Sequence, residues 1–134
     1  IDWYELDPEI VESCYRHLPK ICSKVKKSNS VNTFWGDAFE SIKAVEDSKY
    51  DKIFVDLNDD QYCIDLARKN MKGLQRILKP GGVITAQVGS KDKKPKQVEN
   101  WCKILEKSFG NVTVSGAHIP SFDCNWNFAS SILK

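Results

Sequence analysis

Residues 50–88 read YDKIFVDLNDDQYCIDLARKNMKGLQRILKPGGVITAQV and decide the fold. The segment 50–56 has a β-branched and aromatic centre, which predicts a buried strand. In 63–78 the apolar residues recur at steps of three and four, the spacing of a helix with one buried face. Lys79-Pro80-Gly81-Gly82 is expected to end that helix, and 83–88 to form the next strand. The stretch therefore predicts one strand–helix–strand unit.

The same alternation extends to both sides of this unit. We expect strands at 1–6, 31–35, 112–118 and 126–133, and helices at 8–18, 38–45 and 96–109. Asp7-Pro8-Glu9 supplies a cap, a first-turn proline and an acid for the first of these helices. Strands alternating with helices predict an α/β fold with a doubly wound, mostly parallel sheet. The last two strands have no helix between them and should pair antiparallel. The length of 134 residues suits one domain, 1–134.

Composition excludes several classes of protein. Hydrophobic residues make up 41% and charged residues 28%, with a net charge of +2, so we expect a folded chain without a nucleic-acid-binding stripe. No apolar run is long enough to cross a bilayer and no secretory pattern begins the chain, which predicts a cytoplasmic protein without a membrane partner. The five cysteines form no CxxC pair, so free thiols are favoured over a metal site.

Known catalytic motifs are missing as well. The sequence has no GxSxG, P-loop, HExxH or GxGxxG motif. The sequence therefore gives no support for a nucleophilic hydrolase, a nucleoside triphosphatase, a zinc protease or an intact dinucleotide-binding domain.

Acidic residues follow several of the predicted strands. Ligands of doubly wound sheets bind at the carboxyl ends of the strands, so these residues are candidates for a site. Glu5 could bind a ribose, although a solvated charge is an equally good interpretation. Asp37 could accept a hydrogen bond from an adenine amino group, but capping of the next helix is the favoured reading.

Asp56 emerges from a buried strand, where partial burial would favour proton binding, so it could act as a general base for an amine. Asp59 and Asp60 add negative charge beside it, which suits a cationic substrate. An Asx-rich turn is the structural alternative for this loop.

Four segments carry a resemblance to a known family. They are YELDPEIV (4–11), WGDA (35–38), YDKIFVDLND (50–59) and IPSF (119–122), with the Gln87 to Ser90 stretch and the Trp126 to Ala129 segment alongside. In order and spacing they resemble the spermidine synthase family, over nearly the whole chain. The resemblance implies a methyltransferase-like Rossmann fold that lacks its first strand. It also implies aminopropyl transfer from decarboxylated S-adenosylmethionine to putrescine or a related polyamine, with 5′-methylthioadenosine as product and no tightly bound cofactor.

The resemblance also implies roles for individual residues. Glu5 would bind the donor's ribose, and Asp37 with the backbone of Ala38 its adenine. Asp56 would be the base, and Asp59 would orient an ammonium group of donor or acceptor. Three further residues would contact the polyamine: Gln87, Trp126 with a cation–π face, and Phe122, where the family commonly has tyrosine.

Departures from the family's pattern leave other functions open. The family's glycine-rich donor loop, the strand before it and the small N-terminal β-domain have no counterpart in the chain. The missing strand would lie between strands 1–6 and 50–56, so both should have unpaired edges. We therefore expect an incomplete chain, a homodimer, or a partner chain that supplies the missing elements. An S-adenosylmethionine-dependent methyltransferase and a catalytically silent partner domain are the alternatives.

Overall fold

The chain is described from a computed structural model that covers residues 1–134. The residues form two compact units, 1–45 and 46–134. Each unit has its own sheet, and each is described by itself.

The first unit contains two strands and three α-helices. In chain order they are β1 (Asp2–Glu5), α1 (Pro8–His17), α2 (Pro19–Lys26), β2 (Asn32–Trp35) and α3 (Ala38–Ser41), followed by a 3-10 turn at Ile42–Ala44. β1 and β2 are parallel and pair from Asp2 with Asn32 to Glu5 with Trp35. The rings of Tyr4 and Phe34 stack across the pair with centroids 4.9 Å apart. The predicted parallel crossover is therefore present.

The start of α1 confirms the predicted capping sequence. Asp7 accepts a hydrogen bond from the backbone nitrogen of Glu9 at 2.9 Å, and Pro8 occupies the first turn. The helix ends before Leu18-Pro19, as expected, but Pro19 begins a second helix that the sequence did not predict. Proline disfavours a helical conformation of the residue before it and is well tolerated at a first helical position. The same proline therefore ends one helix and starts the next.

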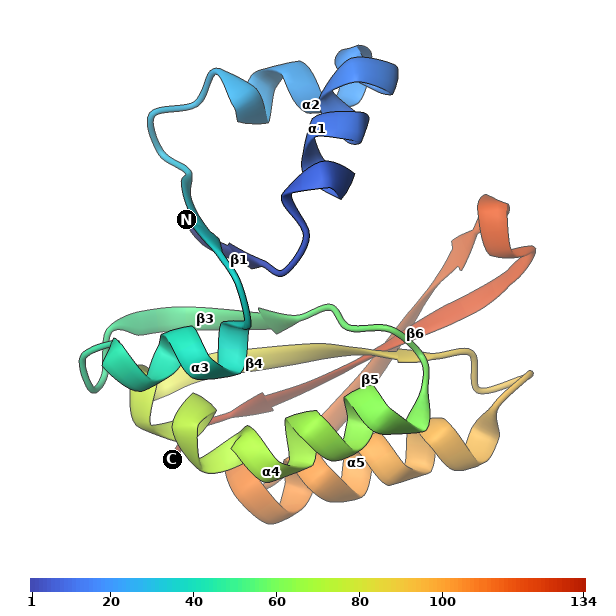
Figure 1. Cartoon of the computed structure of the whole chain (residues 1–134). Helices are drawn as coiled ribbons and strands as arrows, with labels where there is room; N and C mark the ends of the chain where they lie inside the picture. The colour runs from blue at the N-terminus through green and yellow to red at the C-terminus, as the bar shows by residue number, and fades with distance from the viewer. The chain divides into compact units, whose positions relative to one another are not determined.

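The second unit is a four-stranded sheet with two helices. Its elements are β3 (Tyr50–Val55), α4 (Gln61–Ile77), β4 (Leu78–Gly89), α5 (Pro95–Phe109), β5 (Val112–Ile119), a 3-10 turn at Pro120–Phe122 and β6 (Cys124–Ile132). The strand order is β3-β4-β6-β5, and α4 and α5 cover one face of this sheet (Figure 1). β3 and β4 are parallel, whereas β6 is antiparallel to both of its neighbours.

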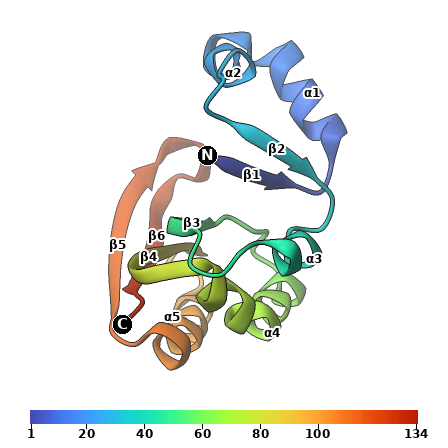
Figure 2. The same cartoon turned by 90° about the vertical axis from the view of Figure 1, so that its left-hand side faces the viewer.

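The predicted antiparallel pair at the end of the chain is thus confirmed. β5 and β6 form a long hairpin, shown in orange and red in Figure 2. The expected mostly parallel sheet is found as a parallel pair in the first unit and a mixed sheet in the second. β1 and β3 are both edge strands of their sheets, as expected.

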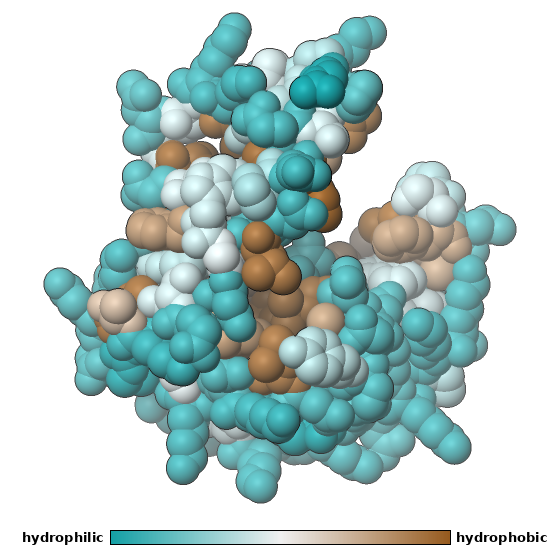
Figure 3. Space-filling model, viewed as in Figure 1, coloured by the Kyte–Doolittle hydropathy of each residue, from teal (hydrophilic) through white to brown (hydrophobic).

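The core of the second unit lies between the sheet and its two helices. Fully buried side chains come from α4, β4 and α5 and include Ile64, Ile77, Leu78, Ile84, Val88 and Leu105. The solvent side of α4 and α5 is mainly hydrophilic, seen as teal over these helices in Figure 3. None of the helices is both long and apolar enough to span a bilayer.

β4 begins earlier than predicted. It starts at Leu78 instead of Val83 and includes the Pro80-Gly81-Gly82 segment that was expected to precede it. Tyr50 pairs with Leu78 and Lys52 with Val83, so the register shifts between them. Gly81 has a φ of 76°, and its nitrogen donates to the carbonyl of Leu133 at 2.8 Å. The glycine pair therefore lies where the register shifts and is held by Leu133, directly after β6, a contact that local sequence does not contain.

Candidate active site

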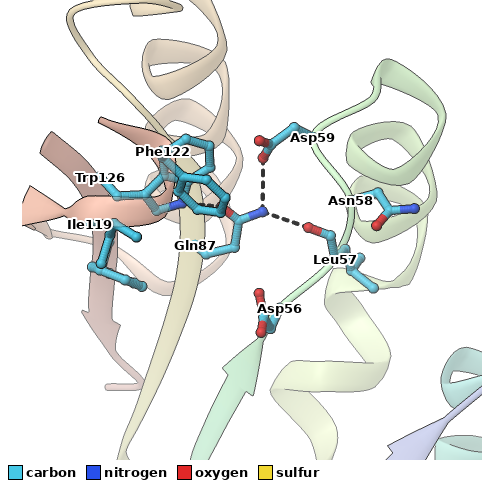
Figure 4. A pocket seen from close by; sticks show the side chains of 9 residues that line it. Asp56, Leu57, Asn58, Asp59, Gln87, Ile119, Phe122 and Trp126 are labelled. Atoms are coloured by element: carbon cyan, nitrogen blue, oxygen red, sulfur yellow. Dashed lines mark hydrogen bonds between the residues drawn. The ribbon is translucent and has the colours of Figure 1, made fainter. Parts of the chain in front are cut away.

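One pocket of about 400 Å³ lies at the edge of the second unit's sheet (Figure 4). The loop after β3, the last part of β4 and the start of β6 meet there, because the antiparallel β6 begins at the edge where β3 and β4 end. The 3-10 turn between β5 and β6 closes one side. The lining residues are Asp56, Leu57, Asn58, Asp59, Gln87, Ile119, Phe122, Trp126 and Phe128.

The acidic residues of the loop after β3 have two different roles. Asp60 is the N-cap of α4 and accepts a hydrogen bond from the backbone nitrogen of Cys63 at 2.7 Å. Asp56 and Asp59 line the pocket instead. Asp56 is exposed, so the partial burial expected for it is wrong. Its strand is less covered than its apolar sequence suggested: Phe54, two residues earlier, is 75% exposed.

No cysteine nucleophile accompanies these acids. Cys63 lies directly behind the loop, and burial, followed by the hydrogen bond to Asp60, raises the pKa of its thiol above the ordinary 9.0. The thiol is therefore protonated at neutral pH, which makes it a poor nucleophile. All five cysteines are free.

Gln87 connects two walls of the pocket. Its Oε1 accepts a hydrogen bond from Trp126 Nε1 at 2.7 Å, and its Nε2 donates to Asp59 Oδ1 at 2.8 Å and to the carbonyl of Leu57 at 2.5 Å (Figure 4). The indole nitrogen can only donate and the carboxylate can only accept. The amide of Gln87 therefore has one satisfactory orientation, and it ties the acidic loop to β6.

The aromatic wall is held from behind. The rings of Phe122 and Trp126 are in contact, with centroids 4.4 Å apart and planes inclined by 42°. Lys93 donates from Nζ to the carbonyl of Phe122 at 2.8 Å, which fastens the 3-10 turn to the loop after β4. The two rings thus present a fixed apolar surface to the pocket, on which a cation could also rest.

The composition of the lining defines the ligand that fits. Asp56 and Asp59 supply two carboxylates, and no lysine, arginine or histidine is among the lining residues. The remainder is largely aliphatic and aromatic. A ligand with positive charges separated by methylene groups satisfies both parts of this surface, because its charges meet carboxylates and its chain meets apolar side chains.

The predicted residues of the first unit make local contacts. Glu5 accepts a hydrogen bond through Oε1 from the nitrogen of Asp7 at 3.0 Å. Asp37 is the N-cap of α3 and accepts through Oδ1 from the nitrogen of Phe39 at 2.8 Å, which confirms the capping interpretation. Ala38 is the first residue of α3. Each bond uses one carboxylate oxygen.

Sequence reasoning missed several residues in or behind the pocket lining. Phe128 could have been found, because it lies two residues from Trp126 on one strand and therefore on the same face. Ile119 and Leu57 gave no signal of their own. Gln97, on α5, donates from Nε2 to Asp59 Oδ1 at 3.3 Å and to the carbonyl of Val88 at 3.2 Å. Nothing in its neighbourhood in the sequence pointed to Asp59, which lies 38 positions away.

Comparison with known proteins identifies the family. The family described as the spermine/spermidine synthase domain matches residues 1–133. The chain belongs to this family. A polyamine aminopropyltransferase of Prochlorococcus marinus strain NATL1A is 29% identical over 97% of the chain and 47% of the relative. Another from strain MIT 9215 is 26% identical over 98% of the chain and 48% of the relative.

Solved structures of spermidine synthases share the fold. The spermidine synthase of Thermotoga maritima superposes with a TM-score of 0.84 at 15% identity, over 99% of the chain and 45% of that protein. A spermidine synthase in complex with the transition-state analogue AdoDATO gives a TM-score of 0.86 at 14% identity, over 99% of the chain and 46% of that protein. The chain spans about half the length of the curated relatives it matches. The match therefore covers one part of each of these relatives.

Proposed function

We propose that the chain is the catalytic part of a polyamine aminopropyltransferase, which moves an aminopropyl group from decarboxylated S-adenosylmethionine to putrescine or a related polyamine. The pocket of the second unit carries this proposal. It combines two carboxylates with an apolar wall and has no basic lining residue. A diamine or triamine has the matching alternation of charge and hydrocarbon.

The proposed reaction needs positioning and one base. The acceptor's amine nitrogen attacks the carbon bonded to the donor's sulfonium, the new C–N bond forms as the C–S bond breaks, and the electron pair of that bond stays on sulfur. The sulfur becomes the neutral thioether of 5′-methylthioadenosine. Asp56 takes the proton of the attacking amine, and Asp59 binds an ammonium group. No protein nucleophile is required.

The acceptor side of the proposal uses the wall opposite the acids. Gln87 and Trp126 form part of the polyamine channel, and their hydrogen bond supports a fixed channel wall. Phe122 contributes its ring but cannot donate a hydrogen bond to an amine as a tyrosine would. We expect its contribution to acceptor binding to be apolar.

Donor binding is assigned to the first unit. Glu5 binds the ribose hydroxyls and Asp37, with the backbone of Ala38, the adenine. In both acids the described hydrogen bond occupies one carboxylate oxygen, so a second acceptor atom is available for a ligand. The donor is a co-substrate, and no tightly bound cofactor is needed. The doubly wound sheet of the methyltransferase-like Rossmann type is part of the proposal, supported by the parallel pairs β1–β2 and β3–β4.

A transfer assay tests the assignment of the base. The protein is incubated with decarboxylated S-adenosylmethionine and putrescine, and spermidine and 5′-methylthioadenosine are quantified by mass spectrometry. Asp56→Asn should lower the rate by about 10²-fold or more, because the general base is lost. Asp51→Asn is the matched control on β3, the strand that precedes Asp56: its carboxylate pairs with Lys79 outside the pocket. Equal rates for Asp56→Asn and the unaltered protein would eliminate Asp56 as the base.

Donor choice separates this function from a methyltransferase. The acidic loop should repel the carboxylate of ordinary S-adenosylmethionine, so the decarboxylated form should bind more tightly. Preference for the ordinary donor would favour the methyltransferase. A silent partner domain would bind neither donor, and would instead associate with another chain or with a second copy, which sedimentation measures directly.

A further inference from the structure

We propose that Gln97 is a positioning residue for aminopropyl acceptors: together with Gln87 it holds one oxygen of Asp59, so that the other oxygen is presented to an ammonium group in the pocket. This inference rests on the proposed function, because it concerns how the pocket recognises a polyamine. It adds a residue of α5 that lies outside the pocket lining.

The first observation is that both hydrogen bonds of Asp59 end on the same oxygen. Oδ1 accepts from Gln87 Nε2 at 2.8 Å and from Gln97 Nε2 at 3.3 Å. Both donors are neutral amides, so they fix the carboxylate without cancelling its charge. A lysine or arginine in either place would neutralise Asp59 and weaken its attraction for a cationic ligand.

The second observation concerns the orientation of Gln97. Its Nε2 also donates to the carbonyl of Val88 at 3.2 Å. A primary amide has two N–H groups, and both are directed at acceptors here. The opposite orientation would place the amide oxygen against a carboxylate and a carbonyl. The side chain is therefore fixed by two acceptors, and the carboxylate of Asp59 is fixed in turn.

The third observation is that the chain leaves room for this amide at Gly89. The residue has a φ of 88°, and a Cβ atom built there would lie 2.7 Å from Gln97 Nε2 and 3.9 Å from Asp59 Oδ1. A side chain at this position would displace the amide from Asp59. Gly89 thus accommodates both the backbone turn at the end of β4 and the approach of Gln97.

The experiment measures putrescine binding to the full chain by calorimetry, with saturating 5′-methylthioadenosine. Gln97→Met has a similar length but no hydrogen-bonding amide, and should weaken putrescine binding about tenfold while the chain stays folded, with only a small fall in melting temperature from the two lost hydrogen bonds. Gln61→Met is the matched control, because Gln61 also donates from its amide to a carboxylate, that of Asp65 at 3.1 Å, but outside the pocket. This control should bind as the unaltered chain does.

A double-mutant cycle shows whether Gln97 acts through Asp59. In an Asp59→Asn background, Gln97→Met should hardly lower the affinity for putrescine, because the carboxylate that Gln97 holds is gone. An equal loss of putrescine affinity with and without the Asp59→Asn substitution would overturn the inference. So would a Gln97→Met chain that binds putrescine as tightly as the unaltered chain, or control and test variants that weaken binding equally.

A ligand-free measurement separates this inference from the proposed function. Three-bond NMR couplings report the χ1 rotamers of Asp59, which should be single in the unaltered chain and averaged in Gln97→Met. If the rotamer responds in this way while the unaltered chain binds no putrescine, the proposed acceptor is wrong and the positioning of Asp59 stands. If the rotamer does not respond, the positioning is wrong whatever the chain binds.

Discussion

The two units differ in how their residues are held. In the first unit the buried apolar side chains are Val11, Phe39 and Ile42, and Ile1, Leu6 and Ile21 are more than 70% exposed. The second unit buries side chains from every one of its helices and from β3, β4 and β6. Because burial of apolar surface is the main stabilising term in folding, the second unit should hold most of the stability.

The site residues differ in the same way. Glu5, Asp7 and Asp37 bond to backbone atoms two residues away. In the second unit, the bonds of Gln87 and Gln97 to the acidic loop join residues 28 to 38 positions apart. The first unit therefore has local order built into short segments, whereas the pocket exists only when the whole sheet of the second unit has formed.

The largest expected fall in the free energy of unfolding comes from truncating one buried side chain in the core of each unit. Leu105 is fully buried, and Leu105→Ala should lower the free energy of unfolding by roughly 2–5 kcal/mol. Val11→Ala in the first unit removes two methyl groups and should cost about 1.5 kcal/mol. Urea unfolding followed by circular dichroism measures both. A larger loss for Val11→Ala would reverse the proposed division of stability.

Loss of the hydrogen bonds that Gln87 makes to Trp126, Asp59 and Leu57 should give the next largest fall in the free energy of unfolding. Gln87→Leu leaves the indole nitrogen of Trp126 and the carboxylate of Asp59 without this half-buried partner, which should cost about 1–3 kcal/mol. Urea unfolding followed by circular dichroism reports the stability, and the NMR signal of the Trp126 indole N–H reports the loss of its hydrogen bond. Gln61→Leu, at an exposed amide, should unfold as the unaltered chain does. Equal unfolding of the two variants would show that the network adds nothing to stability.

Removal of helix caps sharpens the comparison between units. Asp60→Ala uncaps α4 in the second unit, and Asp7→Ala uncaps α1 in the first, each at a cost of about 1 kcal/mol to its helix. For Asp60→Ala, hydrogen exchange should show that backbone amides lose protection throughout the second unit. For Asp7→Ala the loss of protection should stay within α1, because that helix depends on local order. Loss of protection beyond α1 in Asp7→Ala would contradict this difference between the units.

The smallest effect concerns an exposed ion pair on the second unit's sheet. The hydrogen bond from Lys79, followed by its charge, lowers the pKa of Asp51 below 3.8. A carboxyl with a lowered pKa stabilises the fold above 3.8, and this contribution is lost as the pH falls through the lowered value. Lys79→Met should return the pKa of Asp51 toward 3.8, which NMR titration of its carboxyl carbon measures. The melting temperature at neutral pH should barely change, since exposed pairs contribute little. An unchanged titration would show that Lys79 does not control this carboxyl.

The sequence predicted those features that depend on neighbouring residues. The Asp7-Pro8 cap, the buried stripe of α4 and the acid-rich loop after β3 all follow from spacing within a few positions. The family segments named Asp56, Asp59 and Phe122, and the two stretches beside them named Gln87 and Trp126; the pocket brings all five residues together. Their roles in catalysis stay predictions.

Tertiary structure decided what depends on register between distant segments. The strand order β3-β4-β6-β5 places the start of β6 beside the end of β4, which puts Trp126 within hydrogen-bonding distance of Gln87. The register shift of β4 near Gly81 and the approach of Gln97 to Asp59 past Gly89 arise in the same way. Spacing along the chain fixes how each segment folds by itself. Contacts between segments depend on how they pack together, and that is settled only when the core forms.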